Sequence, residues 1–532
     1  MKALLFVLAI TTAISQQPLS ANTTTIVDPA EVTLGERLFL ETRFAQSWYK
    51  DPNKADPTLA KTLTTNKPVR GAFAGKTMNC RACHMVDEHN DELGMRIYAD
   101  FAALSPIPNR NDGMHKTGRN SMGLVNINKA DVDNILFHFD GEFNSLEDLV
   151  IGTFTGRNFG WKVNEKAIAV KHIASIIRND DGKGELASEF GGSYHNVLKG
   201  TDKNLTKEFR LPAEYRIDTA TASDLEILNA VAKLVTAYMN DLSFSTDENG
   251  QYNGSPYDTF LSLNKLPRAP AKNESAAAYG QRLLHKINQL ENPVFVSSTQ
   301  RSFESHQQKF AFSEKALKGM QLFLRAGNGD RSGGNCASCH QLPHFTDFSF
   351  HNTGISQNQY DKLHGAGAFN TISIPNLAQR SNNAAYYLPA STKHPIALST
   401  FRSLPSKKKP GATDLGLWNI VLNDDMPAPQ KKIKSILCKK EKASCTPTKM
   451  LNKSIAAFKT PTLRDLGHSA PYMHSGGLNT LQEVLTMYLT NSELARQHAL
   501  RNTDSDMKKI RLNTSDVENL LAFLNSLNED YD

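Results

Sequence analysis

The chain has 532 residues, of which 39% are hydrophobic and 21% charged, so it is long enough for several domains and too apolar to be disordered. Its 32 glycines and 23 prolines are too few for a collagen-like or low-complexity protein. The formal net charge of +6 is mild for this length and does not indicate nucleic-acid binding.

Residues 1–21 follow the pattern of a secretory signal peptide. Lys2 precedes an apolar run at 3–10, and small and polar residues with a cleavage site at 13–15 follow. A buried first helix is the alternative. The apolar run is too short to cross a bilayer, and no later stretch reaches about 18 apolar residues. We therefore expect a chain that is exported to the periplasm and has no membrane span.

The pattern C-x-x-C-H occurs twice, at residues 80–84 and 336–340. Two thiols at this spacing reach the two vinyl groups of one porphyrin, and the adjacent histidine then lies under the iron as its axial ligand. A thioredoxin-like pair or a zinc site is the alternative, but the histidine in both copies favours haem. We expect two covalently bound c-type haems. Their attachment residues are Cys80, Cys83, His84, Cys336, Cys339 and His340.

Six cysteines in a chain of this length are too few for a scaffold held by disulfides. The two outside the haem patterns, Cys438 and Cys445, lie seven residues apart in a lysine-rich stretch. In an oxidising compartment this spacing predicts a local disulfide, with a pair of free thiols as the alternative.

A helix is expected before each C-x-x-C-H pattern, and both helices carry the string Gly-x-x-Leu-Phe. It occurs at 35–39 and at 319–323. The first of these helices is expected to begin with a capping box from Thr33 to Glu36.

A second repeat follows each pattern. Residues 140–154 align without gaps to 475–489, and both segments open a helix, with Ser145 and Thr480 as expected N-caps. The sequence therefore predicts two related, almost all-helical haem modules with long loops between their helices.

The repeat breaks at one informative position. In the second module four residues line one helix face that should point at the haem, namely Leu481, Val484, Leu485 and Tyr488. Tyr488 could therefore ligate the second iron, whereas its equivalent in the first module is Thr153. Met487 is the competing ligand, and a tyrosine in the core is the plain alternative. The pattern predicts one capped iron and one open iron.

These residues resemble the bacterial dihaem cytochrome c peroxidases and their relative that matures methylamine dehydrogenase. The resemblance runs from about residue 30 to 530. Beyond the two haem patterns it is carried by Arg119-Asn120, by the block FKTPTLRDLGHSAPYMHSG at 458–476 and by the tail at 516–531.

The resemblance implies a mainly α fold of two cytochrome c-like haem domains in tandem. The N-terminal domain (22–258) would hold the peroxide-reacting haem, and the C-terminal domain (259–532) the haem through which electrons enter. The C-terminal domain contains insertions near 265–311 and 375–455. The resemblance also implies His84 and His340 as proximal ligands.

Two further sites follow from the resemblance. Tyr488 falls where the peroxidases have a methionine ligand and the methylamine dehydrogenase-maturing relative has a tyrosine. A calcium ion between the domains is implied by Asn120, with backbone oxygens near Ser469 and Pro471.

The chain departs from the family at two aromatic positions. Phe139 stands where the peroxidases have a tryptophan between the haems, and Trp161 is a nearby aromatic that could substitute for it. The position of the family's catalytic glutamate falls on Phe159, which leaves the acid–base partner open.

Cleavage of a peroxide O–O bond needs an open iron, a group that moves a proton and a second electron. The candidate groups near the first haem are His115, His138 and Glu142. His115 precedes the element where the peroxidases carry a removable distal histidine. Arg119 could hold a haem propionate, and Arg464 is its counterpart in the second module.

The sequence therefore predicts a periplasmic peroxidase that reduces hydrogen peroxide to water with electrons from a small cytochrome c or copper protein. Two alternatives stay open. One is a dihaem oxidase that modifies a protein or an organic substrate, and the other is an electron carrier without catalysis. The natural donor and the oligomeric state, including a homodimer, also stay open.

Overall fold

The computed structural model describes residues 28–50, 79–80, 83–84, 118–128, 135–304, 306–439 and 444–530. The predicted signal peptide and His115 lie outside the described residues. Helices dominate the described chain, which confirms the expectation of a mainly α protein. Within the described ranges, no helix has the length and apolar character needed to cross a membrane.

The elements follow the chain in this order. The N-terminal helices are α1 (Ala30–Leu40), α2 (Gln46–Tyr49), α4 (Leu146–Phe154), α5 (Lys166–Arg178), α6 (Glu185–Glu189), α7 (Tyr194–Lys199) and α8 (Asp224–Asp241). Next come α9 (Pro256–Leu263), α10 (Ala276–Asn288), α11 (Glu314–Leu324), α12 (Ile355–His364), α13 (Leu377–Asn382) and α14 (Ala384–Tyr387). The last helices are α15 (Gln430–Leu437), α16 (Pro447–Ser454), α17 (Leu481–Arg496) and α18 (Thr514–Asn525).

Two small antiparallel sheets complete the described chain. One pairs β1 (Ala326–Asn328) with β2 (Arg331–Gly334), just before the second haem pattern. The other pairs β3 (Phe350–His351) with β4 (Phe458–Lys459), so that it joins two segments about a hundred residues apart.

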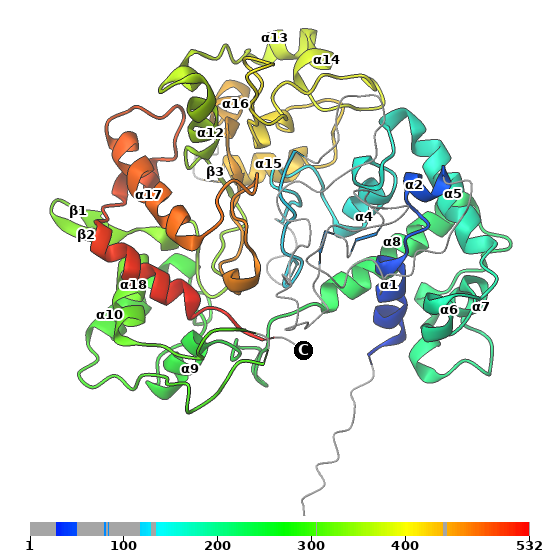
Figure 1. Cartoon of the computed structure of the whole chain (residues 1–532), viewed down its shortest axis with the longest axis horizontal. Coiled ribbons are helices and arrows are strands. Elements are labelled where there is room, and N and C mark those ends of the chain that lie inside the picture. Colours follow the sequence, from blue (N-terminus) through cyan, green and yellow to red (C-terminus); the bar gives the residue numbers. More distant parts are fainter. Residues whose placement is uncertain are drawn as a thin grey trace, which may run out of the picture.

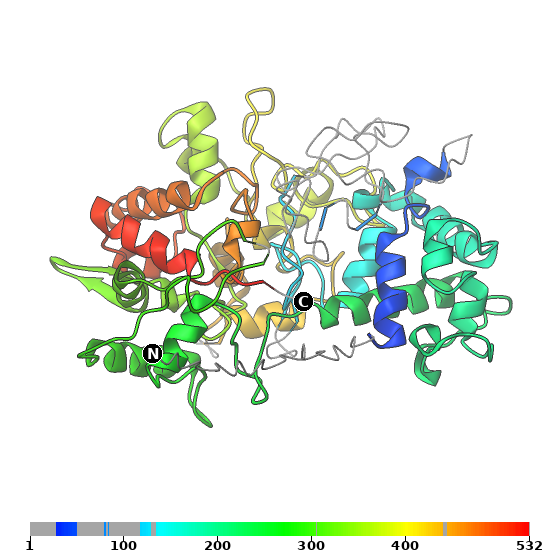
Figure 2. The ribbon, with the colours of Figure 1, turned by 60° about the horizontal axis from the view of Figure 1, so that its bottom comes forward.

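The helices gather into three groups, which are visible in both views (Figure 1, Figure 2). Helices α1 to α8 lie on one side, α10, α11, α17 and α18 on the other, and α12 to α16 lie between them at the top of Figure 1. Each group has its own buried apolar cluster. The first cluster ends at Tyr252 and the second begins at Tyr257. The division of the chain after residue 258 stays a prediction.

The repeated string Gly-x-x-Leu-Phe marks a helix crossing in each half. In the first half α1 crosses α8 at Gly35, where an added Cβ would lie 2.2 Å from the carbonyl oxygen of Leu234. In the second half α11 crosses α18 at Gly319, where a Cβ would lie 1.9 Å from the carbonyl oxygen of Asn519. No side chain fits at either crossing, so glycine is what lets the two backbones touch.

The N-caps predicted for the second repeat are confirmed. The Ser145 hydroxyl accepts a hydrogen bond from the Asp148 backbone N–H at the start of α4 (3.1 Å), and the Thr480 hydroxyl does the same for Glu483 at the start of α17 (3.1 Å). The capping box predicted at Thr33 is wrong. Helix α1 begins three residues earlier and places Thr33 in its first turn.

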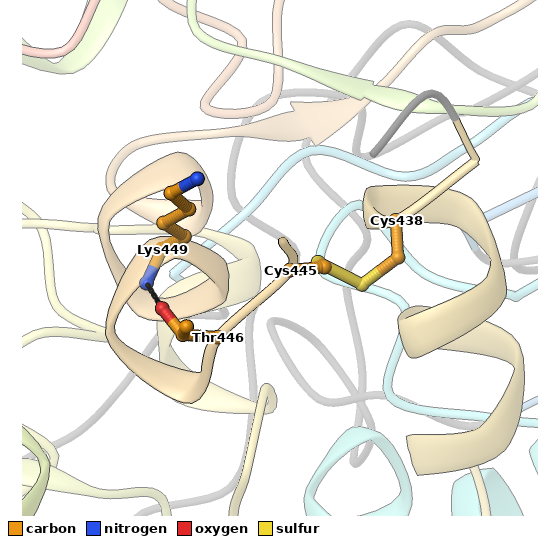
Figure 3. Close-up of a disulfide and its surroundings, with 4 residues drawn as sticks. All are labelled: Cys438, Cys445, Thr446 and Lys449. Atoms are coloured by element: carbon orange, nitrogen blue, oxygen red, sulfur yellow. Dashed lines mark hydrogen bonds between the residues drawn. A yellow bond between two sulfur atoms is a disulfide. The ribbon is translucent and has the colours of Figure 1, made fainter. Parts of the chain in front are cut away.

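The inserted segment has a core of its own, built around Trp418 and Phe401, which pack edge to face. The predicted disulfide between Cys438 and Cys445 is confirmed and joins the end of α15 to the segment before α16 (Figure 3). Leu136 of the N-terminal half also packs into this core. The insertion is therefore a folded layer that contacts the first module.

Candidate haem sites

A cavity of about 280 Å³ opens beside the second C-x-x-C-H pattern. Cys336, Cys339 and His340 line it from one side. Helix α17 lines it from another with all four residues of the predicted face: Leu481, Val484, Leu485 and Tyr488. The helix face predicted from the sequence of α17 therefore lies against this cavity.

His340 is oriented as a ligand. Its Nδ1–H donates a hydrogen bond to the carbonyl oxygen of Phe345 (3.0 Å), which leaves Nε2 to bind a metal. Burial lowers the pKa of His340, so its imidazole is neutral and has a lone pair to donate. Burial raises the pKa of the Cys336 thiol to about 12, and neither cysteine of the pair is in a disulfide. These features fit a covalently attached haem.

Tyr488 and Met487 occupy different surroundings. Tyr488 lines the cavity, and burial together with the nearby sulfur atoms raises the pKa of its phenol. Met487 is buried and is not among the residues that line the cavity; its Sδ accepts a hydrogen bond from the Asn491 side chain (3.2 Å). Of the two, Tyr488 is the residue brought together with His340.

Cationic groups surround the same cavity. Both nitrogens of His351 donate to carboxylates, Nδ1 to Asp504 (2.6 Å) and Nε2 to Asp347 (2.9 Å). Burial alone would lower the pKa of His351, but these two bonds raise it well above the usual value. Burial lowers the pKa of Lys459, on the facing strand β4, to about 7. His351 is therefore a cation held between two carboxylates, and Lys459 is only partly protonated at neutral pH.

Arg464, predicted for the second module, also lines this cavity. It forms a bidentate ion pair with Asp258 (2.8 and 3.0 Å) and a further contact with Glu529 (3.3 Å). Its guanidinium lies 3.8 Å from the ring centre of Tyr252. Burial opposes the charge of Arg464, but Asp258 and Glu529 outweigh that effect and keep its pKa above the usual value.

The first C-x-x-C-H pattern is hydrogen-bonded to the end of α1. The Cys80 backbone N–H donates to the carbonyl oxygen of Phe39 (3.2 Å), and that of His84 donates to the carbonyl oxygen of Cys80 (2.9 Å). Burial, and to a smaller extent the charge of His138, lower the pKa of His84 to about 4. His84 is therefore neutral near pH 7, as an iron ligand must be.

Two predicted proton-transfer residues meet beside His84. The Nδ1–H of His138 donates to Glu142 (3.2 Å), and His138 has a positive φ of 66°. Arg402, from the insertion, contacts Glu142 and lies 3.1 Å from Asp140. Burial alone would raise the pKa of Glu142, but Arg402 and His138 hold it well below its usual range.

Arg119 connects the first module to the insertion. It forms a bidentate pair with Asp414 (2.7 and 2.9 Å) and an ion pair with Asp140 (2.6 Å). Lys432 reinforces this contact by donating to the carbonyl oxygens of Ile135 and Asn144. The guanidinium of Arg119 is thus held by two carboxylates and does not line the second cavity, and its contact with a propionate stays a prediction.

Asn120 lies where the calcium was predicted. Its side-chain N–H donates to the carbonyl oxygen of Pro471 (2.7 Å), with the carbonyl oxygen of Met473 3.4 Å away. Its Oδ1 is buried and has no hydrogen-bond partner among the described residues. Amide orientation is assigned from such bonds, and the opposite orientation would turn three oxygens toward one point. This oxygen-rich set suits Ca²⁺ in its chemistry.

The aromatic candidates lie in separate places. Phe139 lines the second cavity, and its carbonyl oxygen accepts a hydrogen bond from the Lys459 backbone N–H (2.9 Å). Trp161 is buried in the first core, where its Nε1–H donates to the carbonyl oxygen of Phe44 (3.3 Å), and it does not line the cavity. Phe159 packs edge to face against Phe154. Only Phe139 is brought to the second haem site.

Three residues of these sites had no assigned role in the sequence: His351, Lys459 and Arg402. Lys459 lies inside the block at 458–476 that carries the family resemblance, so its place in the sequence could have indicated a functional position. Arg402 gave none, since it meets Glu142 across 260 residues of sequence. Only the folded insertion brings them together.

No family model matches the chain. Among curated proteins, it is 41% identical over 71 residues to the methylamine utilization protein MauG of Methylophilus methylotrophus, covering 13% of this chain and 20% of that protein. It is 36% identical over 75 residues to the cytochrome-c peroxidase IdrP1 of Denitromonas iodatirespirans, covering 14% and 19% of the two chains. A second peroxidase of that organism, IdrP2, is 26% identical over 194 residues, 36% of each chain.

The solved structures that match the chain include a MauG-like protein associated with microbial copper homeostasis (15% identity, TM-score 0.43, covering 95% of this chain and 91% of that one). Another is the diheme peroxidase BthA of Burkholderia thailandensis (15% identity, TM-score 0.43, covering 94% and 86%). The chain spans about a fifth of the length of the MauG and IdrP1 proteins that it matches. The resemblance inferred from the sequence, to dihaem cytochrome c peroxidases and MauG, is confirmed by these sequence relatives.

Proposed function

We propose that this chain is an exported dihaem c-type peroxidase that reduces hydrogen peroxide to water with electrons from a small redox protein such as a cytochrome c or a copper protein. The observation that carries the proposal is the asymmetry of the two sites. Tyr488 lines the second cavity together with His340, whereas Thr153 is its equivalent in the first module. One site is built to be six-coordinate and the other to receive a small ligand.

The haems, when bound, supply an iron that reacts with peroxide at the first site and a stored electron at the second. The chain's own part at the first site is to move a proton. Glu142 is ionised at neutral pH and holds the Nδ1–H of His138, so the other ring nitrogen is left to accept a proton from peroxide and return it to the leaving oxygen. The charge of Arg402 beside Glu142 favours developing negative charge there.

The electron path is the second task of the chain. Phe139 lines the second cavity, and its backbone is hydrogen-bonded to Lys459, which lines the same cavity. Phe139 and Glu142 belong to one short turn, so this segment lies next to both sites. We place Phe139 between the haems, in the position where the related peroxidases have a tryptophan.

The first test uses the holoprotein with both haems attached. Peroxide reduction with a reduced cytochrome c should turn over in the native chain, and the half-reduced protein should show one high-spin haem. His84→Gly should abolish turnover, while His195→Gln in α7, a partly buried histidine outside the haem sites, should leave it unchanged. Two six-coordinate haems with no turnover would overturn the proposal and indicate an electron carrier.

The second test addresses the proton-moving pair. His138→Leu should lower kcat by about a hundredfold or more, because general acid–base catalysis contributes about 10²–10⁴-fold. Glu142→Gln should lower it less, since it removes the orienting charge and keeps the hydrogen-bonding shape. Unchanged turnover in His138→Leu would show that another residue moves the proton, with His115 the remaining candidate.

A second function, oxidation of a protein or organic substrate, is favoured by Tyr488. The phenol is partly buried, its pKa is raised, and it lines the cavity with His340. Tyr488→Met should separate the two functions. If the chain is a peroxidase for small donors, the variant keeps or gains turnover with cytochrome c. If it is a substrate-modifying oxidase, the native chain turns over poorly with cytochrome c and oxidises an added phenol or protein instead.

A further inference from the structure

Two histidines and an aspartate meet behind the second haem cavity. His306 comes from the loop between α10 and α11, Asp465 directly precedes a short 3-10 turn, η10 (Leu466–His468), and His468 ends it. One ligand atom from each lies within 4.8 Å of the other two. None of the three lines the haem cavity. The cluster is therefore separate from the haem sites, although Asp465 directly follows Arg464.

The contacts within the cluster are short. Nε2 of His306 lies 2.6 Å from Oδ1 of Asp465, and Nδ1–H of His468 donates to Oδ2 of the same carboxylate (3.1 Å). The centres of the two imidazole rings lie 3.8 Å apart, with the ring planes tilted by 31°. Nε2–H of His306 also donates a hydrogen bond to the backbone carbonyl oxygen of Glu529 (3.1 Å), and this proton would leave when Nε2 binds a metal.

One oxygen of this cluster is not accounted for by protein hydrogen bonds. Oδ1 of Asp465 is fully buried and forms an ion pair with Nε2 of His306 (2.6 Å), but the hydrogen bond of that nitrogen goes to the Glu529 carbonyl oxygen, and Oδ1 accepts none from the described residues. Leaving a buried carboxylate oxygen without a donor is costly. A cation that binds both the nitrogen and the oxygen would remove that cost.

We propose that His306, Asp465 and His468 bind one divalent transition-metal ion with the chemistry of Zn²⁺. Zinc takes imidazole nitrogen and carboxylate oxygen at roughly 2.0–2.2 Å in tetrahedral sites, which places neighbouring ligand atoms about 3.4 Å apart. The separations of 2.6 and 3.1 Å from His306 and His468 to the carboxylate are slightly shorter, so the side chains need to open only a little. The Glu529 carbonyl oxygen is available as a fourth ligand.

The ion would tie three segments together. The loop of His306 already contacts the end of the chain, because the Glu304 backbone N–H donates to Asp530 (2.8 Å) and Gln308 donates to the Asn525 carbonyl oxygen (2.9 Å). Two imidazoles in the ligand set favour Zn²⁺ and its neighbours over Ca²⁺, which takes only oxygen. This site is therefore distinct in chemistry from the one near Asn120.

The test uses the holoprotein stripped with a chelator and kept in excess calcium. Calorimetric titration with Zn²⁺ should show one site per chain, and elemental analysis should find one zinc for two irons. His306→Gln and His468→Gln should each weaken binding about tenfold or more. His394→Gln is the matched control, since His394 pairs with Asp425 (2.7 Å) outside any such three-residue cluster; it should leave affinity unchanged.

A second readout covers a variant that folds poorly. Zn²⁺ should raise the Tm of the native chain and of His394→Gln, because an ion that binds only the folded state stabilises it, and should not raise the Tm of His306→Gln. Anomalous diffraction at the zinc edge should place the ion between His306 and Asp465. No stoichiometric binding, unchanged affinity in both variants, or an ion located elsewhere would overturn the proposal.

Discussion

In the first half of the molecule α1 crosses α8 with Gly35 against the carbonyl oxygen of Leu234, and in the second half α11 crosses α18 with Gly319 against that of Asn519. The backbone geometry is thus the same twice. The charges that surround the two sites differ: Arg464 is buried with Asp258 and Glu529, while Glu142, beside His138, takes its cation from the insertion. A repeated scaffold here carries two different arrangements of charge.

The largest expected effect separates the two arginines of the repeat. Arg464→Gln should destabilise the fold by about 3–5 kcal/mol, because it leaves Asp258 buried without its cation. Arg119→Gln takes the bidentate partner from Asp414, but the loss should be smaller, because the Arg119 side chain is 13% exposed and that of Arg464 is 1% exposed. Denaturant unfolding followed by circular dichroism measures both. Equal losses would mean that the two arginines play the same structural role.

The helix crossings come next. Gly319→Ala and Gly35→Ala should each destabilise by about 3 kcal/mol, since the new methyl group overlaps a backbone carbonyl in both halves. Gly280→Ala in α10 is the matched control. Its Cβ would meet nothing closer than 3.8 Å, so the change should be neutral or stabilise by up to about 1 kcal/mol. A loss of stability in only one of the two variants would show that the two crossings are not equivalent.

The lowered pKa of the buried His474 predicts that the stability of the fold depends on pH. His474 stacks on Phe458, with ring centres 3.6 Å apart, and burial lowers its pKa to about 4. Below pH ~6.5 the unfolded chain binds a proton at this histidine and the folded chain does not, so stability falls as pH falls toward 4. The loss of folding stability from this histidine is about 2 kcal/mol at pH 5, from the difference between its pKa values in the folded and unfolded chain. His474→Asn should flatten the slope between pH 7 and 5; an unchanged slope would contradict the assignment.

The smallest effects concern the helix caps. Ser145→Ala and Thr480→Ala should each cost about 1 kcal/mol, because each removes the hydroxyl that accepts the first free backbone N–H of its helix. Thr486→Ala on the exposed face of α17 serves as control and should change stability little. If only one of the two variants loses stability, the two caps contribute unequally to the stability of the fold, although both are present in the sequence.

Features set by neighbouring residues could be predicted from the sequence. The caps at Ser145 and Thr480, the disulfide between Cys438 and Cys445, and the face of α17 that lines the cavity all follow from short-range spacing. The capping box predicted at Thr33 is wrong because helix α1 begins at Ala30. A residue that can cap a helix does not by itself determine where the helix starts.

Features set by distant residues could not be predicted. Arg402 meets Glu142, and Asp414 meets Arg119, because a folded layer of the chain lies against the first module, and no periodicity records such a pairing. The same holds for His351, whose two carboxylate partners come from different loops. Ion pairs of this kind are decided by packing, not by local pattern.

The pairing of Arg402 and Asp414 with the first module also sets an order of assembly. A ribosome makes the first haem-attachment segment long before it reaches Arg402, so the growing chain has Asp140 and Glu142 without their later cation. The cluster of charges around Glu142 is therefore completed only after both C-x-x-C-H segments have been synthesised.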